Sequence, residues 1–144
     1  MPALFLIIMT RQEFLAMSLP FNLKCDIQSN GVVYHQVFYK PKEYELEFIY
    51  EKKISWPILR PLSELKEIIE HNDEKFNPID RYLEFFYIQN LKFEIDRIIL
   101  QNESEILNLP LSFLLKLVEW NFDIAGLIKK RQAIDYRTVA GFFF

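Results

Sequence analysis

Apolar and polar residues alternate on both sides of a turn signal in residues 23–39, LKCDIQSNGVVYHQVFY, as expected for two half-buried strands. Asn30 and Gly31 supply the two positive-φ residues of a type I′ turn, which joins strands through a two-residue loop. The pattern therefore predicts a hairpin in which Ser29 pairs with Val32, Ile27 with Tyr34, and Cys25 with Gln36. Its core face would carry Leu23, Cys25, Ile27, Val32, Tyr34 and Phe38.

A second alternating run, EYELEFIY at residues 43–50, follows the hairpin after Lys40-Pro41-Lys42. Aromatic and aliphatic side chains fall on one side of the run and glutamates mainly on the other, the pattern of a strand with one face in water. We expect a third strand here, antiparallel to the second strand of the hairpin.

Helical spacing and capping signals mark the remaining elements. Thr10 followed by Glu13 is a capping box that predicts a helix over 11–17, and Pro20 ends it. Apolar residues recur at helical spacing over 62–70, where His71-Asn72 would then form the helix end. Further helices are expected over 80–91, over 109–120 and over 124–130, the last with Asp123 as its N-cap, while 92–100 fits a helix or a strand.

These elements predict a single α+β domain over residues 1–144, in which a small antiparallel sheet, the hairpin plus a third strand, packs with four to five short helices. The apolar run 4–9 near the N-terminus fits a short strand or docked tail. It also fits an N-terminal extension over 1–8 of a protein whose original start is Met9. It is too short to span a bilayer.

Composition and charge indicate the cellular compartment of the chain and the kinds of partner it can bind. It has 144 residues, a formal net charge of −3 and a single cysteine, Cys25. One cysteine permits neither an internal disulfide nor a cysteine-based zinc cluster, and it fits a reducing compartment, so we expect a cytoplasmic protein with no membrane partner. The charge gives no general excess for binding nucleic acid, so such contact would need a local patch.

The sequence contains no strong pattern for catalysis, metal binding or phosphate binding. Cys25 and His35 lie in one hairpin but project from opposite faces in the predicted register, where His35 sits across from Asp26. Arg60, Glu64 and His71 form another candidate group. Glu64 and His71 would lie two helical turns apart, about 10 Å, which is too far for these two residues to act as an acid–base pair. Spacing typical of metal ligands and glycine-rich phosphate loops are both absent from the sequence. We therefore expect no enzyme activity, no catalytic residues, no metal and no cofactor.

Three groups of side chains are candidates for binding a partner. The first is a stripe of glutamates on alternate positions of the predicted strand, which lie about 6.6–6.8 Å apart, close to the spacing of phosphates along a nucleic acid strand. Such a stripe could imitate a nucleic acid backbone, although a solvated outer face of the sheet explains it as well. A basic group could contact phosphates, although cations also suit a helix C-terminus. The aromatic C-terminus either completes the core or forms a patch for a partner or a second copy. The residues are Glu43, Glu45 and Glu47; Lys129, Lys130 and Arg131 with Arg137; and Phe142, Phe143 and Phe144.

Three blocks of the sequence resemble a group of small uncharacterised proteins from phages and prophages of Bacteroidetes-type bacteria. They are MTRQEFLAMSLPFNLKC from Met9, PILRPLSELKEIIEHNDEKFNPI from Pro57, and KLVEWNFDIAGLIKKRQAID from Lys116, and together they cover rather less than half of the chain. The chain departs from the group at Asn121, where a histidine is common. The resemblance carries no established catalytic residues to this sequence.

The resemblance implies a small accessory protein made inside an infected or lysogenic cell. Such proteins commonly bind a host protein or ribonucleoprotein, and one recurrent role is inhibition of antiviral defence, CRISPR effectors included. We therefore expect an anti-CRISPR-like inhibitor. Two alternatives remain at this point: a self-assembling structural or replication-associated phage protein, and an enzyme that uses Cys25.

Overall fold

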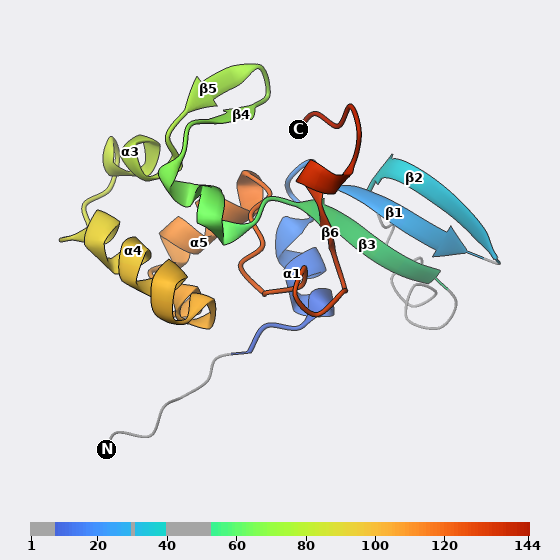
Figure 1. The fold of residues 1–144 in the computed structure, drawn as a ribbon, viewed down its shortest axis with the longest axis horizontal. Helices are drawn as coiled ribbons and strands as arrows, with labels where there is room; N and C mark the ends of the chain where they lie inside the picture. Colours follow the sequence, from blue (N-terminus) through green and yellow to red (C-terminus); the bar gives the residue numbers. More distant parts are fainter. Residues whose placement is uncertain (1–7, 30, 40–52) are drawn as a thin grey trace.

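Four strands form a mixed sheet in the order β2-β1-β3-β6 (Figure 1). Strands β1 (Lys24–Ser29) and β2 (Val32–Phe38) form the expected hairpin, and β3 (Lys53–Leu59) runs antiparallel to β1 on its other side. The short β6 (Ile134–Asp135) runs parallel to β3, so the sheet is not purely antiparallel as predicted. The computed structural model describes residues 8–29, 31–39 and 53–144, and the strand predicted over 43–50 lies outside them.

The hairpin follows the predicted register near its turn and departs from it beyond Ile27. Ser29 pairs with Val32 and Ile27 with Tyr34, but Cys25 pairs with Val37 rather than Gln36. Two residues of β2 lie opposite Asp26 at this bulge, where the Asp26 carboxylate accepts a hydrogen bond from the backbone N–H of Gln36 at 3.0 Å. The predicted core face holds for Leu23 and Cys25, whereas every side chain of β2 is exposed.

Two predicted helices are confirmed, and a third helix forms where the sequence fitted either a helix or a strand. Helix α1 (Arg11–Ser18) begins with the predicted capping box between Thr10 and Glu13, and α5 (Leu111–Glu119) is the predicted buried helix. The ambiguous segment forms α4 (Leu91–Gln101), with a short 3-10 helix η2 (Glu103–Asn108) after it. A mixed sheet with helices confirms the α+β class.

The helix predicted over 62–70 is wrong beyond its first turn. Residues Leu62–Lys66 form the 3-10 helix η1, Glu67 has extended backbone angles, and β4 (Ile69–His71) pairs with β5 (Glu74–Phe76). Exposed Ile68 is followed by buried Ile69, and exposed Glu70 by buried His71, so burial alternates with the period of a strand. Asn72 and Asp73 both have positive φ and form the turn of this second hairpin, so His71-Asn72 is not a helix end.

Two other predicted helices are shorter or absent. The segment 80–91 contains only the end of α3 (Pro78–Leu83) and the first residue of α4, and Asn90 between them has a left-handed backbone. Residues 124–130 form turns rather than a helix, with Gly126 at a φ of 67°. Asp123 nevertheless caps this segment, because its carboxylate accepts hydrogen bonds from the N–H groups of Leu127 and Ile128 at 2.8 and 2.9 Å.

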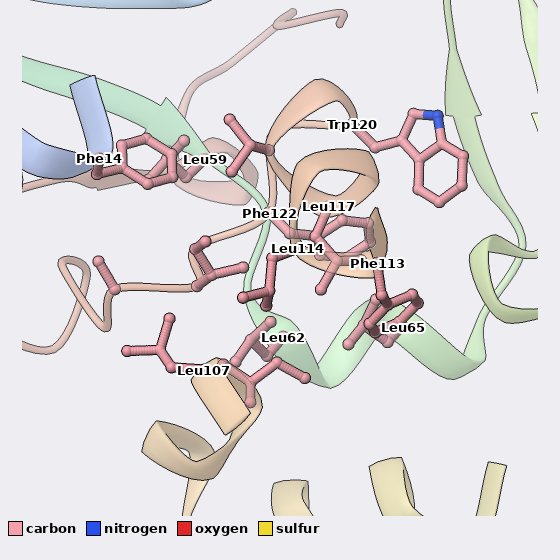
Figure 2. Close-up of a cluster of buried hydrophobic side chains, with 14 of the residues drawn as sticks. Phe14, Leu59, Leu62, Leu65, Leu107, Phe113, Leu114, Leu117, Trp120 and Phe122 are labelled. Atoms are coloured by element: carbon pink, nitrogen blue, oxygen red, sulfur yellow. The ribbon is translucent and has the colours of Figure 1, made fainter. Parts of the chain in front are cut away.

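One cluster of buried apolar side chains joins the sheet to the helices. In Figure 2, Phe14 of α1 lies beside Leu59 of β3 at one side of the cluster, Leu117 of α5 lies near its middle, and Phe113 of the same helix lies at the other side. The β4–β5 hairpin projects beside α3, and the C-terminal segment lies between that hairpin and the four-stranded sheet (Figure 1). Among the described residues, no helix has the length and apolar character needed to cross a membrane.

Candidate functional site

Arg60 lies where β3 ends, and its backbone is held on both sides. Its N–H donates to the Asn121 carbonyl at 2.7 Å, and its own carbonyl accepts from the N–H of Asp123 at 2.9 Å. This short parallel bridge places the side chain between the β4–β5 hairpin and the C-terminal segment. The position of the guanidinium is therefore set by the backbone of two segments about 60 residues apart in the sequence.

The Arg60 guanidinium is buried, with 2% of the residue exposed. Its Nε donates to the Trp120 carbonyl at 3.1 Å, and Nη2 donates to the carbonyl of Glu70. The ring of Phe144 lies 4.0 Å from the guanidinium carbon and that of Tyr136 5.4 Å from it, as in cation–π contacts. Burial lowers the Arg60 pKa, while Tyr136 and Glu64 oppose that shift.

Glu64 is the buried carboxylate of the site. The Tyr136 hydroxyl, from the 3-10 helix η3 (Tyr136–Thr138), donates to both of its oxygens, at 2.6 and 2.9 Å. Burial and the bond to Glu64 raise the pKa of Tyr136 to about 12, so the phenol stays protonated at neutral pH and remains a donor. This bond joins residues 72 positions apart in the sequence and holds the C-terminal region against η1.

His71 of β4 is also buried. Burial, and next the charge of Arg60, lower its pKa to about 4, so the imidazole is neutral at pH 7. Its Nδ1 has no hydrogen-bond partner among the described residues, and its ring centroid lies 6.2 Å from that of Phe144. Arg60 is thus close enough to both Glu64 and His71 for their charges to interact, but the three residues do not lie on one helix, and the expectation that Glu64 and His71 form no acid–base pair stays a prediction.

A pocket of about 260 Å³ opens beside this cluster. Three exposed carboxylates, Glu67, Glu70 and Asp73, lie on its wall, and none of them forms an ion pair with a cation in the described part of the chain. The other walls combine four aromatic rings with two isoleucines and the Arg60 and Glu64 side chains. We call this the acidic aromatic pocket, and its lining consists of Arg60, Glu64, Glu67, Ile68, Ile69, Glu70, Asp73, Tyr136, Phe142, Phe143 and Phe144.

The three C-terminal phenylalanines have different environments. Phe142 is buried under Lys24, whose Nζ lies 5.3 Å from the ring centroid, and Phe144 packs on Phe142, Tyr136 and Arg60. Phe143 is 75% exposed at the edge of the pocket. Phe142 and Phe144 therefore pack within the fold as the first hypothesis expected, whereas the exposed Phe143 leaves the second hypothesis, a patch for a partner, as a prediction.

The basic group predicted to bind a partner is largely engaged within the chain. Lys129 lies 3.5 Å from a Glu103 carboxylate oxygen, Lys130 donates to the Ala125 carbonyl at 3.2 Å, and Arg137 pairs with Asp135 at 2.7 Å. Arg131 is exposed and has a left-handed backbone. The glutamate stripe Glu43, Glu45 and Glu47 lies outside the described residues.

Cys25 and His35 do not come together. Cys25 is fully buried, and burial raises the pKa of its thiol, which therefore stays protonated at neutral pH. His35 is exposed, and its Nδ1 lies 3.0 Å from an Asp26 carboxylate oxygen, as the predicted register implied. Within residues 8–29, 31–39 and 53–144, no three His, Cys, Asp or Glu residues are grouped so that they could hold a metal ion.

The acidic aromatic pocket contains residues that the sequence did not single out. Glu67 and Glu70 looked like the polar face of a helix, and Asp73 followed its predicted end. The Asn72-Asp73 pair was the local signal that a hairpin turn stood there instead. Tyr136 had no local signal, because its partner Glu64 is 72 residues away. Comparison with protein-family models, curated proteins and solved structures gave no match for the chain.

Proposed function

We propose that this chain is a non-enzymatic accessory protein of a phage or prophage, and that it inhibits antiviral defence by binding a host protein or ribonucleoprotein. The phage setting rests on the resemblance of the three sequence blocks. The mode of binding rests on the acidic aromatic pocket, whose unpaired carboxylates and aromatic walls suit a lysine or arginine side chain of the partner.

Defence effectors that handle nucleic acid supply such side chains. Their binding channels are positively charged, since they hold a polyanion by lysine and arginine contacts. A surface with carboxylates at Glu67, Glu70 and Asp73 competes for the same cations. An aromatic side chain beside the carboxylates adds a cation–π contact of about 0.5–2 kcal/mol. A surface that carried only carboxylates would lack this contact. A CRISPR effector is the partner class that we favour.

Charge reversal at the pocket tests this proposal. Glu67→Lys and Glu70→Lys should each abolish protection of a phage in a CRISPR-immune host, measured as plating efficiency, and should weaken binding to the purified guide-loaded effector. Glu84→Lys is the matched control, because Glu84 is an exposed glutamate at the end of α3 and the substitution changes the net charge equally. We expect that control to behave as wild type.

Each outcome of the plating test separates one part of the proposal from another. Protection by wild type that survives both reversals places the binding surface elsewhere on the chain. Loss of protection in Glu84→Lys as well shows a dependence on overall charge and not on the pocket. An unprotected phage in cells that express wild type overturns the anti-CRISPR role itself.

A further inference from the structure

The connection between α3 and α4, together with the first turn of α4, presents four large aromatic side chains to solvent. Phe85 is 76% exposed, Phe86 44%, Tyr87 84%, and Phe93 in the first turn of α4 66%. We call these four residues the aromatic patch. Scattered apolar side chains on a protein surface are ordinary, but four aromatic rings within nine residues of sequence are a concentrated group of a kind that marks an interaction site.

A pocket of about 220 Å³ lies directly beside the aromatic patch. Its walls include Phe76, Tyr82 and Trp120, together with Phe85 and Phe86 of the patch itself. The walls are held by ring contacts, since Phe86 stacks on Tyr82 with centroids 4.8 Å apart, and Phe76 lies 5.1 Å from Trp120. One surface of the molecule therefore carries both protruding aromatic rings and an aromatic hollow.

Charges around this hollow are already paired within the chain. Arg81 pairs with Glu74, Lys116 with Glu119 at 3.0 Å, and nearby Lys92 with Asp80 at 2.8 Å. The charged residues that line the hollow therefore balance one another, in contrast to those of the acidic aromatic pocket. Two identical copies of such a surface can face each other without like-charge repulsion, whereas two copies of an unpaired acidic surface cannot.

The area of the patch is on the scale that a dimer requires. Aromatic side chains bury about 150–250 Å² each when fully covered, so four rings with these exposed fractions offer about 400–700 Å². A stable interface of standard size buries about 800 Å² on each partner. The patch therefore supplies about half of that area or more before the walls and rim of the hollow are counted.

We propose that the aromatic patch is the interface of a symmetric dimer, in which Tyr87 of each copy inserts into the hollow of the other. A two-fold contact is isologous, so the same surface must provide both the inserted group and its receptor. Tyr87 is the ring available for insertion, because it is the most exposed of the four and does not line its own hollow, whereas Phe85 and Phe86 do. This inference is independent of the partner that binds the acidic aromatic pocket.

Sedimentation velocity over a range of micromolar concentrations tests the dimer. Wild type should show a mass that rises from one to two copies, and Tyr87→Ser should raise the dimer dissociation constant by at least about tenfold, as loss of a central aromatic residue does. Phe143→Ser is the matched control, since Phe143 is also a largely exposed aromatic residue (75%, against 84% for Tyr87) but does not line the hollow, and it should leave the constant unchanged. A monomer at every concentration, or a dimer insensitive to Tyr87→Ser, overturns the proposal.

Insertion into the hollow has a separate optical readout. Trp120 lines the hollow, and in a Trp56→Phe background it is the only remaining tryptophan of the chain. Its emission should shift to shorter wavelength as concentration rises and water leaves the hollow, and Tyr87→Ser should remove that shift. A dimer that forms with no change in Trp120 emission would place Tyr87 outside the hollow and contradict the proposed contact.

Discussion

Arg60 is a buried cation, and its surroundings account for that burial. A charge taken out of water is costly unless hydrogen bonds and opposite charge replace the lost hydration. Two backbone carbonyls accept from the guanidinium, the Phe144 ring covers it, and the Glu64 carboxylate bound by Tyr136 belongs to the same cluster. Removal of one member therefore leaves a buried charge or polar group of another member without its partner. The same contacts hold this wall of the acidic aromatic pocket in place.

His71 should make stability depend on pH. Its folded pKa of about 4 lies below the ordinary value of 6.5, so between these values the unfolded chain binds a proton that the folded chain does not. Stability from this group is complete above pH 6.5 and falls as pH drops toward 4, by roughly 3 kcal/mol in total. Urea unfolding of wild type and of His71→Phe across this range measures the difference.

The two pH profiles should diverge in a defined way. Carboxylates titrate in both proteins, so their contribution cancels in the comparison, and only the wild-type profile should carry the extra loss below pH 6.5. Profiles that stay parallel from pH 7 to pH 4 would show that His71 is protonated freely in the folded state.

At the scale of single elements, α1 depends on local signals that the sequence displays. Thr10 and Glu13 cap one another's backbone N–H groups, and Phe14 and Leu15 of the helix are buried in the core. Thr10→Ala should therefore destabilise the protein by about 1 kcal/mol, measured from the urea midpoint. Thr10→Ser keeps the hydroxyl and should stay close to wild type, and an equal loss in both variants would mean that the cap is not the cause.

Elements without such local signals were predicted less well. The apolar residues at 62, 65, 68 and 69 fit helical spacing, yet the chain forms a single 3-10 turn and then a strand of the β4–β5 hairpin. Asn77 Nδ2 donates to the Lys66 carbonyl at 3.1 Å, a bond from outside the segment that ties down its backbone where a helix would have continued. In 84–90, the three aromatic side chains are exposed and only Ile88 is partly buried against the core, so no continuous buried face selects a helix there.

The C-terminal segment links distant parts of the whole molecule. Phe144 should stabilise the fold by about 2–3 kcal/mol through its contacts with Arg60, Tyr136 and Phe142, so Phe144→Ala should lose that amount in urea unfolding. Phe143→Ala should change stability by less than about 0.5 kcal/mol, because Phe143 is exposed. Equal effects of the two substitutions would contradict this division of the segment.

The amino-acid sequence by itself determined the α+β class, the first hairpin near its turn, the capped helix α1 and the buried helix α5. Each of these follows from residues within about one element of each other, through side-chain period, turn conformation or capping. Only the tertiary structure decided that β6 joins β3 in parallel, that residues 69–71 form a strand, and that Tyr136 binds Glu64. The acidic aromatic pocket belongs to this second group, because long-range hydrogen bonds and shared burial assemble it from segments that carry no sign of one another in the sequence.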